Sequence, residues 1–157
     1  MTRTNNRIAG IVVKDGQVLL MHRFKNGEEY WVFPGGGQEE GETPEETVVR
    51  EIDEEASIQV RPTKLLYKIT WDIDGVNYFY LCEYLGGVPE LGADSEECKK
   101  TQEGKQSYEP AWVDIGEISK LKVYQLEIRD LLLEDYTKDF SEPMKHLNIK
   151  FSERRQE

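Results

Sequence analysis

The 157-residue chain is long enough for one domain with a real core and too short for two domains of ordinary size. Its formal net charge of −11 repels polyanions, so an extended nucleic-acid surface or an anionic-membrane surface is disfavoured. The two cysteines and two histidines have no zinc-binding spacing, and no apolar run reaches membrane length. We therefore expect a single cytoplasmic domain without a structural metal.

Antiparallel hairpins are expected along the first half of the chain. Runs of β-branched and aromatic residues flank three tight-turn dipeptides, which are Asp15-Gly16, Asn26-Gly27 and Asp74-Gly75. The predicted strands are 8–13 paired with 18–23, 24 paired with 30–33, and 65–71 paired with 76–84, with a further short strand at 111–115.

Two helices are expected among these strands. The first should run from Pro44 to about Ala56, because Thr43 and Glu46 form the elements of a capping box and Pro44 suits a first turn. The second is expected at about 123–133, after a short turn near 117–121.

The remaining segments complete a mixed α+β domain. The polar stretch 86–108 predicts an irregular loop. We expect a mixed, mostly antiparallel sheet with helices on its faces, in one domain over residues 1–140. A tail of uncertain order follows at 141–157.

The stretch PGGGQEEGETPEETVVREIDEEAS, residues 34–57, is strongly acidic. On the predicted helix Glu51, Glu54 and Glu55 share an arc of about 100° beside the apolar stripe. Arg50 can neutralise one carboxylate, for which Glu42 is a plausible partner. The unbalanced charge suits Mg2+ or Mn2+, since both prefer carboxylate oxygens. On this pattern alone, a solvated acidic face stays open as the alternative.

The spacing of fixed residues in this stretch is specific. Gly36, Glu42, the run Arg50-Glu51-Ile52, the pair Glu54-Glu55 and Ile58 resemble the Nudix box of the Nudix hydrolase family. One position departs from that pattern, because Ser57 stands where the family has glycine. We expect Ser57 in the left-handed conformation that ends the helix, where a Cβ costs about 1 to 2 kcal/mol.

The resemblance implies a Nudix-like α/β/α sandwich and the hydrolysis, by water, of a diphosphate linked to another group. It implies Mg2+ or Mn2+ held by the Gly35 carbonyl, Glu51, Glu54 and Glu55. The general base is left open among Glu51, Glu103 and Glu109. Glu109 is the preferred contributor from outside the box, although ordinary loop charge is the alternative. The predicted catalytic residues are Glu51, Glu54, Arg50 and Glu109.

The group attached to the diphosphate is the least determined feature. Arg23, Gly36 and Gly37 are predicted to bind substrate, although Arg23 has an ordinary strand-end charge as its alternative. The expected substrate is a small nucleoside diphosphate derivative, such as a nucleoside triphosphate, a modified nucleotide or a nucleotide sugar, rather than capped RNA. A nucleotide-binding or sensing module of the same fold, without turnover, is the alternative. A homodimer is left open.

Overall fold

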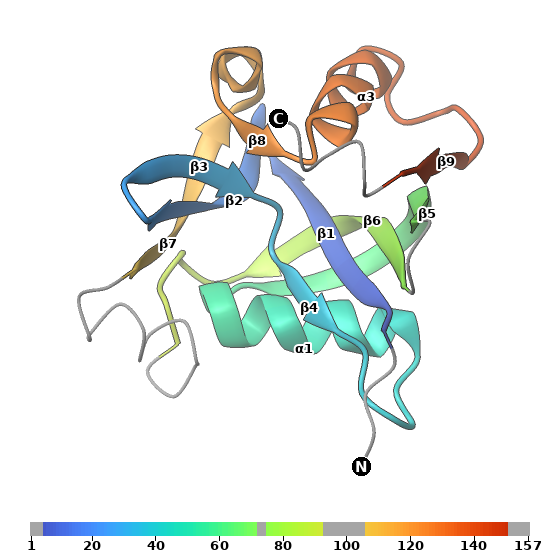
Figure 1. Ribbon diagram of the computed structural model, residues 1–157, viewed down its shortest axis with the longest axis horizontal. Coiled ribbons are helices and arrows are strands. Elements are labelled where there is room, and N and C mark those ends of the chain that lie inside the picture. The colour runs from blue at the N-terminus through green and yellow to red at the C-terminus, as the bar shows by residue number, and fades with distance from the viewer. Residues whose placement is uncertain (1–4, 72–74, 93–105, 151–157) are drawn as a thin grey trace.

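The computed structural model describes residues 5–71, 75–92 and 106–150. Its strands form one mixed sheet in the order β8-β3-β2-β1-β6-β5-β9, with β4 paired to β1 and β7 paired to β2 (Figure 1). The strands are β1 (Arg7–Lys14), β2 (Gln17–Lys25), β3 (Glu28–Val32), β4 (Gly35–Gly37), β5 (Gln59–Trp71), β6 (Val76–Gly86), β7 (Gln106–Asp114), β8 (Val123–Tyr124) and β9 (Lys145–Ile149). The helical elements are α1 (Pro44–Ala56), the 3-10 helix η1 (Ile115–Lys120) and α3 (Leu126–Tyr136).

The tight turns form where the sequence predicts them. Asp15 and Gly16 have φ of 51° and 76°, and Asn26 and Gly27 have φ of 54° and 78°. Positive φ at both central residues matches the right-handed twist of the strands, so β1–β2 and β2–β3 are antiparallel hairpins. The third predicted pairing, β5 with β6, is also antiparallel, although Asp74 lies outside the described residues.

Several element boundaries differ from the prediction, most of all at the starts of three elements. Strand β5 begins at Gln59 rather than at 65, and β7 begins at Gln106, so the end of the predicted loop is strand. The predicted second helix begins too early, because Val123 is fully buried and pairs with Trp31 through β8. Tertiary pairing therefore overrides local helix pattern there. Of the predicted loop, residues 93–105 lie outside the described residues.

Strand β4 was not predicted, since three glycines carry no side-chain alternation. It pairs with β1 through Ile8 opposite Gly36 and Ala9 opposite Gly35. A Cβ on Gly35 would lie 2.2 Å from the Ile8 carbonyl oxygen. Only glycine therefore permits this close approach of the two backbones.

Helices cover both faces of the sheet (Figure 1), which confirms the α+β class and the sandwich. On one face, α1 buries Val48, Ile52 and Ala56 against residues of β1, β2 and β6. On the other, α3 and η1 bury Ile128, Leu132 and Ile118 against a second cluster. We call these the α1 face and the α3 face.

The chain after residue 140 extends the sheet. Strand β9 pairs in parallel with β5. The Lys145 ammonium lies 2.5 Å from the Asp135 carboxylate, which also accepts a 2.7 Å hydrogen bond from the Tyr67 hydroxyl. The prediction of a domain boundary at 140 remains a prediction. In the described part of the chain, no helix is long and apolar enough to cross a bilayer.

Candidate active site

Helix α1 begins and ends at the residues that the sequence predicts. Its capping box is complete, with the Glu46 amide donating to Thr43 Oγ1 at 3.1 Å and the Thr43 amide donating to Glu46 Oε1 at 3.0 Å. These bonds satisfy two amides that the first turn would otherwise leave unpaired. The cap therefore fixes the helical register that groups Glu51, Glu54 and Glu55 on one side of α1.

Arg50 joins α1 to the loop before it. Its guanidinium donates twice to the Glu42 carboxylate, at 2.6 and 2.9 Å, which confirms the predicted partner. It also donates to Glu51 at 2.9 Å, to Glu54 at 3.4 Å and to the Gly37 carbonyl at 3.2 Å. The hydrogen bond from Arg50 lowers the pKa of Glu42 from 4.5 to about 2. Both groups are therefore charged at neutral pH.

Two of the box carboxylates are buried. Glu51 is 8% exposed and Glu55 is 7% exposed, whereas the Glu54 side chain is 53% exposed. A Cβ on Gly36 would lie 2.3 Å from Glu51 Cδ. The missing side chain at Gly36 thus leaves the space that the Glu51 carboxylate fills.

The donor set fits a hard divalent cation in its chemistry. Glu51, Glu54 and Glu55 come from one helix, two of them are shielded from water, and Arg50 donates to Glu51 and Glu54 as well as to Glu42. Within the described ranges, no three Asp, Glu, His or Cys side chains already converge in metal-binding geometry. A cation would therefore have to draw Glu51 and Glu54 away from Arg50.

The Gly35 carbonyl, predicted as a metal ligand, has a cationic neighbour. Arg7 Nη2 donates a hydrogen bond to it at 3.3 Å. Arg7 begins β1, belongs to no sequence motif and was not predicted as a site residue. Only the register of β1, with Arg7 opposite Gly37 on one side and Asn77 on the other, reveals its position.

Arg23 is engaged by aromatic side chains. Its guanidinium carbon lies 4.0 Å from the centre of the Tyr108 ring and 5.4 Å from that of Tyr30, and it donates to the Tyr108 hydroxyl. Arginine commonly stacks on rings in this way. For Arg23 to contact the substrate as predicted, the substrate would have to lie against the stacked side chains of Arg23 and Tyr108.

Glu109 is not brought to the box. In the β2–β7 register it lies opposite His22, whose ring stacks on Trp31 with centroids 4.2 Å apart. Because side chains alternate along a strand, Glu109 points to the α3 face, while its neighbours Tyr108 and Pro110 point to the α1 face. The other candidate base, Glu103, lies outside the described residues.

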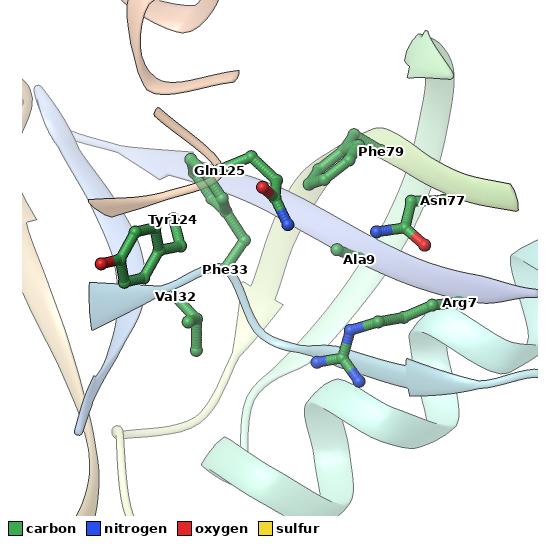
Figure 2. Close-up of a pocket in the computed structure, with 8 residues that line it drawn as sticks. All are labelled: Arg7, Ala9, Val32, Phe33, Asn77, Phe79, Tyr124 and Gln125. Carbon is green, nitrogen blue, oxygen red and sulfur yellow. The ribbon is translucent and has the colours of Figure 1, made fainter. Parts of the chain in front are cut away.

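A pocket of about 80 Å3 lies on the α3 face, beside β4 (Figure 2). Its floor is apolar and aromatic, and the side chains of Arg7, Asn77 and Gln125 surround it with nitrogen and oxygen atoms. The lining residues are Arg7, Ala9, Val32, Phe33, Asn77, Phe79, Tyr124 and Gln125. They come from four segments far apart in the sequence, so no local pattern indicates the pocket.

Comparison with known proteins decides the family. A family model described as the NUDIX domain matches residues 4–134. The chain belongs to the NUDIX family. This confirms the resemblance seen in the acidic stretch.

Relatives of this NUDIX domain differ in what their names describe. A "MutT-like protein" of Streptomyces ambofaciens is 33% identical over 130 residues, covering 80% of this chain and 75% of the relative. An "RNA pyrophosphohydrolase" of Actinobacillus succinogenes is 45% identical over 60 residues, covering 37% of this chain and only 29% of the relative. The second match therefore spans less than a third of that protein.

Solved structures share the fold of this NUDIX domain. A NUDIX hydrolase from Nitrosomonas europaea has a TM-score of 0.72 at 21% identity, covering 96% of this chain and 81% of that one. An ADP-ribose pyrophosphatase from Streptococcus suis has a TM-score of 0.63 at 18% identity, covering 92% and 98%. At these identities the likeness establishes the fold alone.

Proposed function

We propose that the protein is a Nudix-type pyrophosphohydrolase that uses Mg2+ or Mn2+ to hydrolyse the diphosphate linkage of a nucleoside diphosphate derivative. The observation that carries this proposal is the acidic cluster of α1. Two buried carboxylates, Glu51 and Glu55, lie beside a third, and Arg50 already binds Glu42. Carboxylate oxygens grouped on one helix in this way are the ligands that Mg2+ and Mn2+ prefer.

The residues of the Nudix box have different proposed roles. Glu51, Glu54, Glu55 and the Gly35 carbonyl would hold the metal, which when bound neutralises phosphate oxygens and lowers the pKa of water. Arg50 donates to Glu42 and to the Gly37 carbonyl, so it joins the loop to the helix. Gly36 and Gly37 bring backbone close to the phosphates. A box carboxylate, Glu51 or Glu54, accepts the proton of the attacking water.

Glu109 has weaker support as a catalytic residue than the box glutamates, because it points to the α3 face. Arg23 is retained as a substrate-binding proposal, with its guanidinium stacked on Tyr108. A cytoplasmic location and a homodimer both stay predictions.

We place the group attached to the diphosphate in the pocket on the α3 face. Aromatic walls and the amides of Asn77 and Gln125 suit a flat heterocycle that carries hydrogen-bonding groups. A nucleoside has both properties. The net charge of −11 favours a free nucleotide over RNA.

A sensing module that binds nucleotide without turnover is the second candidate. The complete set of box carboxylates favours the enzyme, since binding alone does not require three of them.

The test is a panel of nucleoside triphosphates, oxidised nucleotides, nucleotide sugars, ADP-ribose and capped RNA, assayed with Mg2+ and with Mn2+. The proposal expects metal-dependent release of a nucleoside monophosphate from at least one free nucleotide. Tight nucleotide binding with no turnover would favour the sensing module, and a strong preference for capped RNA would overturn the substrate class.

A further inference from the structure

Arg7 lies at the junction of the pocket and the box. It lines the pocket, and its guanidinium donates to the Gly35 carbonyl at 3.3 Å (Figure 2). Strand β1 makes this possible, because it pairs with β4 on one edge and with β6 on the other. One side chain therefore reaches both regions.

Arg7 differs from its neighbours in charge. Among the described residues that line the pocket, it alone carries a formal charge, and the others are apolar or neutral polar. A guanidinium presents five N–H donors in a planar fork, of which the contact with Gly35 uses one. Such a fork matches two oxygens of a phosphate.

The contact with Gly35 also has an electrostatic consequence. A guanidinium within hydrogen-bonding distance of a carbonyl competes with a metal ion for that oxygen, and the two cations repel each other. An anion in the pocket would attract the guanidinium away from Gly35. This would remove the competition for the carbonyl oxygen and reduce the repulsion between the two cations.

We propose that Arg7 binds the substrate phosphate nearest the pocket, and that this contact couples nucleotide binding to metal binding at the box. The inference rests on the proposed function, since it assumes a phosphorylated substrate and a metal near Gly35. Without nucleotide, Arg7 opposes the metal; with nucleotide, it turns to the phosphate. Linkage then requires that each ligand tighten the other.

The experiment compares Arg7→Gln, Arg7→Lys and wild type, with Arg61→Gln as the matched control. Arg61 lies on β5, is 67% exposed and pairs with Glu83, so its variant removes the same charge far from the pocket. Mn2+ binding is measured without nucleotide, from the electron paramagnetic resonance of unbound Mn2+. KM and kcat are measured with the nucleotide that wild type hydrolyses fastest.

Arg7→Gln should bind Mn2+ about threefold more tightly and raise KM about tenfold, with kcat nearly unchanged. Arg7→Lys keeps the charge but loses the fork, so its Mn2+ affinity should stay near wild type while KM rises. Arg61→Gln should change neither. Unchanged or weaker Mn2+ binding by Arg7→Gln, or a KM within twofold of wild type, would overturn the proposal.

The two proposals fail in different ways. If wild type hydrolyses no nucleotide, the proposed function fails, and the Mn2+ comparison still decides whether Arg7 opposes the metal. If wild type is active and the Arg7 variants match it, only the role of Arg7 fails.

Discussion

The α1 face holds an acidic cluster built from neighbouring residues, whereas the α3 face holds a pocket built from distant ones. The box carboxylates Glu51, Glu54 and Glu55 lie within one 13-residue helix, and Glu42, the partner of Arg50, lies two residues before its start. The pocket takes residues from β1 and β6, from the end of β3 with the residue after it, and from β8 with the residue after it. In the proposed function, the residues that perform the chemistry therefore lie in one local segment, whereas the residues that select the substrate come together only when the sheet forms.

Removing a box carboxylate should have the largest effect. Glu54→Gln or Glu55→Gln should lower kcat by about 100-fold or more with every substrate, because each removes a metal ligand. Steady-state kinetics at saturating Mg2+ measure this. Asp53→Asn is the matched control, since it makes the same charge change on an exposed position of the same helix. Wild-type activity in either glutamine variant would contradict the assignment.

Filling the space beside Glu51 should have the next largest effect. Gly36→Ala places a Cβ 2.3 Å from Glu51 Cδ, so the carboxylate must move. Misplacement of this kind should lower kcat about 10- to 100-fold. Gly116→Ala serves as control, because a Cβ there meets nothing within 4 Å. Equal kinetics in the two alanine variants would show that Glu51 tolerates displacement.

The Arg50–Glu42 pair should contribute to stability in a pH-dependent way. Glu42→Gln should cost about 2 kcal/mol at pH 7, because it removes a charged, bidentate partner of Arg50. The pKa of Glu42 is lowered from 4.5 to about 2 on folding, so its contribution is present above pH 4.5 and is lost as pH falls toward 2. Urea unfolding across this range should show the difference between wild type and variant shrinking. A difference that stays constant would contradict the pair's role.

The end of α1 should respond least. Ser57 has φ of 58° and ψ of 33°, which confirms the predicted left-handed conformation, and its hydroxyl donates to the Glu90 carbonyl at 2.8 Å. Ser57→Ala keeps the strain and loses the hydrogen bond, so it should cost about 1 kcal/mol. Ser57→Gly loses the bond and relieves the strain, so it should lie within about 0.5 kcal/mol of wild type.

The hydrogen bond to Glu90 revises the expectation from the sequence, in which glycine simply stabilises the helix end. Thermal unfolding of both variants measures the comparison. Ser57→Gly no more stable than Ser57→Ala would show that the left-handed conformation costs nothing here.

The sequence predicted the box because its geometry is local. The spacing of Thr43, Pro44 and Glu46 is enough to locate α1, and helical periodicity then groups the three glutamates. It missed Arg7 and the pocket, because these depend on which strands become neighbours. Strand β4 was also not predicted, because its three glycines pair with β1 through the absence of side chains. Glu109 was predicted as a contributor from outside the box, whereas its position opposite His22 and the alternation of side chains along β7 direct it to the α3 face.

The central claim is that the box residues perform the chemistry and the pocket residues select the substrate. Its most direct test is the ratio of kcat/KM between two nucleotides that differ only in the base. It is compared in wild type, Glu54→Gln on the α1 face and Asn77→Ala in the pocket. We expect Glu54→Gln to lower both values by the same factor and leave the ratio unchanged, and Asn77→Ala to change the ratio by about tenfold or more. A ratio altered by Glu54→Gln but not by Asn77→Ala, or no metal-dependent turnover by wild type, would contradict the account.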